Sequence, residues 1–263
     1  MYLGEVACPI RSRFWANEAV TGKVRDELTG AGKEVYASSL ILTVDREEHL
    51  AFAELARRLG RIEINSPSFL GLAHQYPAVA GAALNVYNSA SACFLAKHAC
   101  RRIVLPCELS LPSIASIAGA CAVPIEIIVH GHVPIAISCT CHTVRSLGRD
   151  AGDCGELCRR YPEGMVLQAE DRPMLRIEGP QTLSAGTCCL VEYLPQLAAA
   201  GVDTVRIIPQ WDHTCRIVRI YRDVLDGRLQ GRQAVQELKY LSFDALCNGW
   251  LLGKAGWIYE SPN

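Results

Sequence analysis

Residues 102–129, RIVLPCELSLPSIASIAGACAVPIEIIV, hold the pattern that decides the fold. The segment begins with a short run rich in β-branched residues, 102–105, and ends with another, 125–129. Residues 110–121 between them have the length and composition of a helix. Two strands that flank a helix are typical of a parallel βαβ unit, so the segment predicts an α/β fold.

The same alternation of short strands and longer helices recurs along the chain. The predicted strands cover residues 2–4, 34–40, 61–65, 79–83, 102–105, 125–129 and 204–208. The predicted helices lie near residues 12–30, 45–59, 67–76, 88–99, 110–121, 190–200, 211–225 and 231–241. Asp45, Glu48 and Gly60 stand where a helix cap, a capping box and a helix end belong. Because seven strands are one fewer than an eight-stranded barrel needs, we predict a single TIM-type (β/α) barrel domain over residues 1–263.

Residues 139–190 depart from this rhythm. They carry six cysteines and few long apolar runs. We therefore interpret the segment as a Cys-rich insertion before the last strand of the barrel. Insertions at the carboxyl ends of barrel strands are where such folds keep their chemistry.

Composition and charge narrow the class of protein. Half of the 263 residues are apolar, which excludes a disordered chain. The net charge of −1 argues against a broad attraction to nucleic acid or to an anionic membrane. The amino terminus lacks the basic and apolar regions of a secretory signal, and prolines and Glu126 interrupt the most apolar stretch, 109–129. These features predict a cytoplasmic protein without a membrane span.

Thirteen cysteines are the most unusual feature of the composition. Since the cytosol keeps thiols reduced, each is expected to be a buried small side chain or a metal ligand. Asp153 and Glu156 form a capping box that predicts a short helix, with Cys154 and Cys158 four residues apart on one face. Two thiolates so placed need two further ligands to complete a tetrahedral site or an iron–sulfur cluster.

The two further ligands come from other segments. Cys141 is the near candidate, and Cys139 is its alternative. Cys8 follows the first predicted strand, and strand ends of a barrel meet at one mouth, so Cys8 is a candidate for the fourth ligand. The competing interpretation is that all of these cysteines are ordinary buried thiols. For the remaining cysteines, namely Cys93, Cys100, Cys107, Cys121, Cys188, Cys189, Cys215 and Cys247, we expect packing in the core or on helices.

Charged and polar residues near these segments are the other candidates for chemistry. Arginines near a cluster would offset its negative charge, although they are equally typical of a solvated loop; the residues in question are Arg145, Arg149, Arg159 and Arg160. Polar residues after predicted strands form a possible substrate or donor site, made of Asn85, Asn88, Glu108, His130 and His132. Glu108 is also suited to cap the following helix.

Hydrolase and nucleotide-binding motifs are missing from the sequence. There is no HExxH, P-loop or GxGxxG motif and no Ser-His-Asp order. We therefore expect neither protease activity nor a nucleotide cofactor.

Eight stretches in the same order resemble the ubiquinone-biosynthesis members of the collagenase-like peptidase superfamily. They are residues 2–8, 83–88, 105–110, 131–136, 141–162 with its three cysteines, 179–182, 206–210 and 247–250. The resemblance implies a TIM-type barrel and a 4Fe-4S cluster whose ligands fall on Cys8, Cys141, Cys154 and Cys158. Such proteins have a further strand and helix ahead of the 2–5 stretch, so either these elements precede Met1 in the natural protein, which is our prediction, or the barrel lacks its first strand-helix unit.

The resemblance further implies a function and a partner. Such proteins form a heterodimer with the homologous UbiU and hydroxylate a ubiquinone precursor without oxygen, with a small hydroxyl donor such as prephenate as one possibility. Two alternatives stay open: a non-catalytic partner whose cluster stabilises a docking loop, and an RNA-modifying hydroxylase of the same superfamily. The near-zero net charge disfavours the RNA alternative.

Overall fold

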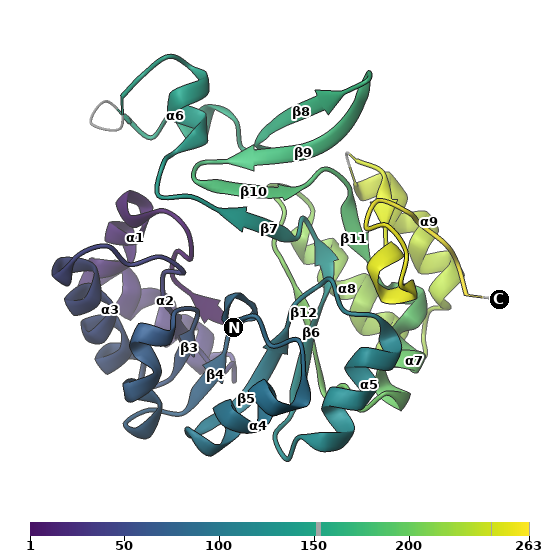
Figure 1. Ribbon diagram of the computed structural model, residues 1–263, viewed down its shortest axis with the longest axis horizontal. Helices are drawn as coiled ribbons and strands as arrows, with labels where there is room; N and C mark the ends of the chain where they lie inside the picture. Colours follow the sequence, from purple (N-terminus) through teal and green to yellow (C-terminus); the bar gives the residue numbers. More distant parts are fainter. Residues whose placement is uncertain (151–153, 243, 263) are drawn as a thin grey trace. The chain divides into compact units, whose positions relative to one another are not determined.

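The computed structural model describes residues 1–150, 154–242 and 244–262. The chain divides into two compact units. The first contains Met1–Leu105 and Ala120–Pro124, and the second contains Pro106–Gly119 and Ile125–Asn263. Each unit is an α/β structure in its own right (Figure 1).

The first unit is built on five parallel strands. They are β1 (Tyr2–Leu3), β2 (Tyr36–Ser38), β3 (Ile62–Ile64), β4 (Ala78–Ala80) and β5 (Cys100–Leu105), paired in that order. All five strands that the sequence predicts for this part of the chain are therefore confirmed, with ends that differ by a few residues.

Helices cover one face of these strands. They are α1 (Pro9–Ala16), α2 (Glu18–Gly30), α3 (Arg46–Leu59), the 3-10 helices η1 (Pro67–His74) and η2 (Ala82–Leu84), and α4 (Ser89–Lys97). Helix α3 packs against β2 and α1 (Figure 1). Phe52 and Leu55 of α3 are buried, as are Ile62 and Ile64 of β3. Their burial forms the apolar core of this unit.

Local capping explains where these helices begin and end. The Asp45 carboxylate accepts a hydrogen bond from Glu48 N at 2.9 Å, and Gly60 ends α3 at φ 70°, as predicted. The single helix predicted near 12–30 is wrong, because Asn17 accepts from Ala19 N and Val20 N and starts a second helix there. A polar side chain that captures free backbone amides sets a helix start within an otherwise helical pattern.

The second unit has a central group of four strands. Strand β6 (Ile125–Gly131) is buried along its whole length. It pairs in parallel with β12 (Thr204–Ile207) and antiparallel with β11 (Thr187–Cys189). Strand β11 in turn pairs in parallel with β13 (Leu246–Cys247), with Cys188 opposite Cys247.

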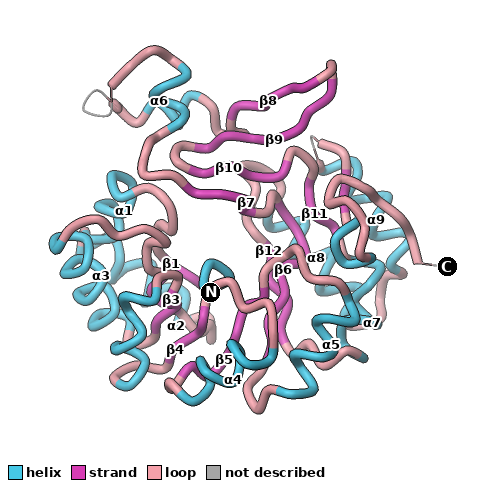
Figure 2. The backbone as a smooth tube through the Cα atoms, viewed as in Figure 1, coloured by secondary structure: helices cyan, strands magenta, loops and turns pink. Residues whose placement is uncertain are grey.

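A separate antiparallel sheet lies above these strands in the view of Figure 2. Its order is β7 (Pro134–Ile137), β10 (Gln181–Ser184), β9 (Arg172–Glu178) and β8 (Met165–Ala169). The predicted insertion thus contains most of a sheet that the sequence reasoning did not foresee. Glu170 and Asp171 turn between β8 and β9 with φ 50° and 61°, as a two-residue hairpin turn requires.

Helices of the second unit are mostly short. They are α5 (Leu111–Ala120), α6 (His142–Ser146), α7 (Leu194–Ala199), α8 (Thr214–Leu225), α9 (Gly231–Leu241) and the 3-10 helices η4 (Leu157–Arg160), η5 (Val191–Tyr193) and η6 (Gly249–Leu252). Helices α8 and α9 pack together and bury Ile217, Ile220 and Leu238. No helix of the described ranges is long and apolar enough to span a membrane.

Candidate functional site

Three of the four predicted cluster ligands lie on adjacent segments of the second unit. Cys141 immediately precedes α6, and Cys154 and Cys158 flank the start of η4. Helix α6 packs against η4 and β9. All three cysteine side chains are partly exposed. Their elements therefore share one exposed segment, which we call the cysteine segment, residues 138–161.

The helix predicted from the capping box is wrong. Asp153 lies outside the described residues, and Glu156 makes no capping bond to η4. Gly155 and Glu156 take left-handed backbone, at φ 48° and 52°, which no α-helix allows. Cys154 thus precedes the 3-10 helix, so it does not share a helical face with Cys158.

Cys8 belongs to the first unit. Strand β1 ends at Leu3, and Cys8 stands directly before α1, not at the strand end. The Cys8 amide donates to the Glu5 carboxylate at 3.3 Å, and Glu5 also pairs with Arg11 at 3.0 Å. Burial raises the pKa of the Cys8 thiol against the opposing backbone hydrogen bonds around Arg11 and Ile10.

The predicted cysteine ligands suit an iron–sulfur cluster in their chemistry, but their arrangement in the structure does not. Free thiols are the ligands that such clusters use. In the part of the chain that the structure describes, no three His, Cys, Asp or Glu side chains are arranged to hold a metal ion. The cysteine segment thus supplies three thiols without a closed ligand set, and no reaction step is derived through a cluster.

The arginines of this segment are mostly solvated. Arg145, Arg159 and Arg160 are exposed. Arg159 forms an ion pair with Glu156 at 2.7 Å, which holds the left-handed residue against η4. The solvated-loop alternative therefore describes these side chains.

His132 belongs to a polar network that joins the two sheets of the second unit. Its Nδ1 lies 2.9 Å from the Ser184 carbonyl oxygen, and its Nε2 lies 3.3 Å from Asp244 Oδ2. Arg176, which is buried, donates to the same carboxylate oxygen at 2.6 Å. Burial opposes ionisation of Asp244, but the bonds and charges of His132 and Arg176 outweigh it and lower the pKa of that carboxyl. Both ring nitrogens of His132 therefore have a partner. We call this network of His132, Arg176, Ser184 and Asp244 the clamp, because it joins the two sheets.

His130 lies two residues earlier and is fully buried. Its Nδ1 stands 3.4 Å from the Tyr221 hydroxyl, which donates to the Val129 carbonyl oxygen at 2.7 Å. Burial, helped by the charge of His132, lowers the pKa of His130 to about 4. The imidazole is therefore neutral near pH 7 and serves the core.

The other predicted substrate residues lie at the surface. Asn88 caps α4 by accepting from Ser91 N at 2.9 Å, which is a structural role. Asn85 ends η2 in left-handed conformation at φ 55°, and it is exposed. Glu108 is exposed three residues before α5. The five predicted residues are divided between the two units and form no common cluster within either.

Sequence reasoning missed two buried carboxylates. In the first unit, Glu63 of β3 is 1% exposed and accepts from the Ser38 hydroxyl of the neighbouring strand. Asn65 donates to Ser38 Oγ at 3.1 Å and to the Ser39 carbonyl at 3.0 Å. Its amide fills the space beside Gly81, where a Cβ would stand 1.9 Å from Asn65 Oδ1. A buried polar network at the carboxyl ends of parallel strands is where α/β folds bind ligands.

The second buried carboxylate is Glu126 of β6. Arg206 of the adjacent strand β12 donates to Glu126 Oε1 at 2.5 Å. Both carboxylates sit between isoleucines in strand sequences, where the pattern alone predicts only an apolar strand. A charged residue between two apolar residues of a predicted strand is the sequence signal that would have identified Glu63 and Glu126.

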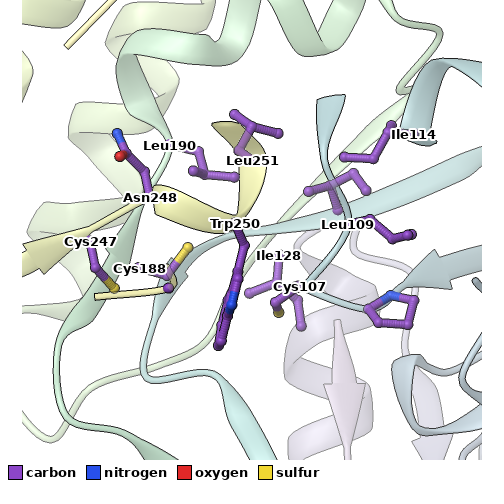
Figure 3. A pocket seen from close by; sticks show the side chains of 13 residues that line it. Cys107, Leu109, Ile114, Ile128, Cys188, Leu190, Cys247, Asn248, Trp250 and Leu251 are labelled. Atoms are coloured by element: carbon purple, nitrogen blue, oxygen red, sulfur yellow. The ribbon is translucent and has the colours of Figure 1, made fainter. Parts of the chain in front are cut away.

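A small pocket lies in the second unit (Figure 3). Its lining includes Cys107, Cys188, Cys247 and the Trp250 indole, with apolar side chains around them. The cavity volume of about 20 Å³ holds about one water molecule. Burial is the main reason that the pKa values of Cys107 and Cys247 rise to about 12 and that the pKa of Cys188 rises well above its ordinary value. The thiols are neutral near pH 7.

The stretch from Cys247 to Trp250 also fastens the carboxyl-terminal segment. The Asn248 amide donates to the Glu260 carbonyl at 2.7 Å, and Glu260 N donates back to Asn248 Oδ1 at 3.0 Å. Gly256 packs so closely on Trp250 that a Cβ would stand 2.4 Å from the ring. These contacts give the stretch from Cys247 to Trp250 a structural role, which is to hold the carboxyl-terminal segment in place.

The remaining cysteines are expected from the sequence to be buried in the core or on helices. This expectation is wrong for Cys215, and Cys93, Cys107 and Cys121 are only partly buried. Cys215 is exposed on α8, on the side away from the buried Ile217 and Ile220. Cys100, Cys188, Cys189 and Cys247 are buried as expected.

Comparisons with known proteins place the chain among relatives. The family model described as Peptidase family U32 matches residues 1–259. The chain is 28% identical over 151 residues to tRNA hydroxylation protein P2 of Bacillus subtilis (strain 168). That match covers 52% of this chain and 47% of the relative, so the chain spans about half the length of the curated relative it matches.

Proposed function

Because this chain belongs to peptidase family U32, we propose that it is the iron–sulfur subunit of an oxygen-independent hydroxylase. The observation that carries the proposal is the similarity to a tRNA hydroxylation protein. The sequence has no protease motif to support the chemistry in the family's name.

The cluster ligands of this proposal are Cys8, Cys141, Cys154 and Cys158. Three of these cysteines are partly exposed on the cysteine segment. A 4Fe-4S cluster takes four thiolates and would supply single-electron transfer. The chain's own contribution is to carry the cysteines at or directly before α6 and η4, which pack against each other, and α6 also packs against β9.

The substrate of the proposal is a ubiquinone precursor. Its support is the eight-stretch resemblance to UbiV, which implies a UbiU-like partner in a heterodimer and a small hydroxyl donor such as prephenate. Hydroxylation is a two-electron change, and a cluster passes electrons singly, so a second redox centre on the partner would complete the count.

Two experiments test the proposal. Anaerobic purification should give a brown protein with iron and sulfide in equal amounts, whereas a colourless zinc protein would contradict the cluster. Deletion of the gene should abolish ubiquinone in anaerobic cells and spare it in aerobic ones. Normal ubiquinone in the anaerobic deletion strain would contradict the ubiquinone assignment.

The second candidate function is hydroxylation of RNA. The Bacillus subtilis relative is named for tRNA hydroxylation, which favours this second candidate. Nucleoside analysis of total tRNA from the deletion strain separates the two, because loss of a hydroxylated nucleoside with normal ubiquinone would select the RNA activity. A third possibility, a docking subunit without catalysis, predicts that a cluster-ligand variant loses its partner as well as activity.

A further inference from the structure

The pocket of the second unit contains a pair of cysteines in an unusual relation. Cys188 of β11 and Cys247 of β13 are direct partners in the parallel register. Neighbouring strands lie about 4.8 Å apart, and a disulfide needs Cα atoms about 4.4–6.8 Å apart. Side chains of register partners in parallel strands leave the sheet on the same face, and both thiols line the same cavity.

We propose that Cys188 and Cys247 form a cross-strand disulfide when the protein meets hydrogen peroxide. The proposal is independent of the hydroxylase assignment and of its cluster ligands. In Figure 3, Cys188 and Cys247 lie on one side of the Trp250 indole, and Cys107 lies on the other.

The chemistry of this step balances with peroxide as the oxidant. The sulfur of one cysteine attacks a peroxide oxygen, the O–O bond breaks, and a sulfenic acid and one water form. The second sulfur attacks the first, the S–O bond breaks, and a second water leaves as the S–S bond forms. Two thiols are oxidised and one peroxide is reduced to two waters.

Cavity size selects the oxidant. A volume of about 20 Å³ admits a molecule of about the size of water, and hydrogen peroxide is only slightly larger. Oxidised glutathione is far too large to reach these buried sulfurs. The raised pKa values make the reaction slow at neutral pH, because the thiolate is the nucleophile.

Strand alternation supplies a matched control. Cys189 adjoins Cys188 in the chain and is equally buried, but its side chain points to the other face, where its sulfur lies 3.8 Å from the Tyr221 hydroxyl. Cys189→Ser should therefore leave the disulfide intact, and so should Cys107→Ser. Cys188→Ser and Cys247→Ser should each abolish it.

The test is mass spectrometry of the full chain after anaerobic treatment with peroxide and a metal chelator. Trypsin digestion without reduction should yield residues 177–206 linked to residues 240–254. The initial rate of disulfide formation should rise about tenfold per pH unit from pH 7 to 9, and treatment with oxidised glutathione should give no linked peptides. A Cys188–Cys189 bond, a bond to Cys107, or recovery of both peptides unlinked at pH 9 would each overturn the proposal. Fragmentation of the linked wild-type peptide between Cys188 and Cys189 assigns the bond to one of these two residues even where a variant fails to fold, and a bond to Cys189 would also overturn the proposal.

Discussion

Two groups of cysteines in the second unit show how one side chain acquires opposite chemistry. Cys141, Cys154 and Cys158 are partly exposed on a short-helix segment, whereas Cys107, Cys188 and Cys247 line a cavity of about 20 Å³. Burial raises the pKa values of the second group far above that of a free thiol. Exposure keeps the first group available to a metal, and the raised pKa values make the second group slow to react at neutral pH.

The largest expected effect is on bound iron. Cys154→Ser should reduce iron per chain at least about tenfold in anaerobically purified protein, because a hydroxyl does not replace a thiolate in a cluster. Cys215→Ser, which changes an exposed cysteine of α8, is the control and should keep full iron. Equal iron in both variants would remove the cluster assignment.

Alkylation rates sharpen the same comparison. At pH 7 a thiol with a pKa of about 12 carries about a thousandfold less thiolate than a free cysteine, so Cys107 and Cys247 should resist iodoacetamide. Cys139 and Cys215 are exposed and should react within minutes. Peptide mapping after alkylation with and without denaturant measures the reactivity of both groups of cysteines. Rapid alkylation of Cys247 in the folded protein would contradict its burial in the pocket.

The clamp of His132, Arg176, Ser184 and Asp244 should contribute strongly to the stability of the fold. Asp244→Ala leaves the Arg176 guanidinium buried without its carboxylate, which should cost about 3 kcal/mol in the free energy of unfolding. Asp212→Ala, at an exposed carboxylate beside His213, should change the free energy of unfolding by less than about 0.5 kcal/mol. Because the folded pKa of Asp244 is lowered, its contribution exists above the unfolded pKa and disappears as the pH falls through the folded value. Denaturant titrations at pH 7 and pH 3 measure both effects.

His130 should destabilise the fold in mild acid. Its folded pKa of about 4 lies below the unfolded value near 6.5, so the unfolded chain binds the proton first as the pH falls. At pH 5.5 the loss relative to pH 8 should be about 1.4 kcal/mol. His130→Gln should remove this dependence and His213→Gln, at the surface, should retain it. An unchanged acid slope in the first variant would contradict the neutral buried imidazole.

The smallest effect concerns the hydrogen bond beneath His130. Tyr221→Phe removes the donor to the Val129 carbonyl, which still accepts from Leu190 N at 2.9 Å. The carbonyl therefore stays satisfied, and the cost should be about 1 kcal/mol. Calorimetry of the variant measures it, and a loss several times larger would indicate that the hydroxyl also supports the Cys189 side of β11.

Several elements were predictable because local chemistry and pattern agree. Asp45 and Gly60 bound α3 as their side-chain and backbone preferences dictate, and the β-branched runs became strands. The sheet of β7 to β10 was not predictable in this way. Its strand β8 is largely exposed, and its hairpin turn Glu170-Asp171 lacks the glycine that usually marks such a turn. The closed barrel stays a prediction of the sequence.

The candidate site was predictable in residue type more than in geometry. The cysteines of the cysteine segment are partly exposed, but left-handed Gly155 and Glu156 replace the expected helix start. Glu63 and Glu126 acquire their partners from neighbouring strands, Ser38 and Arg206. A single sequence does not contain that register, because it arises from pairing between segments far apart in the chain.

The pairing of β11 with β13 also has a consequence for synthesis of the chain. Cys188 leaves the ribosome 59 residues before its register partner Cys247. At about 5–20 residues per second, translation needs about 3–12 s to deliver that neighbour. During this interval one edge of β11 and its two adjacent thiols wait without their final cover. The nascent protein is therefore open to small oxidants and to wrong strand partners at a place that the finished fold closes.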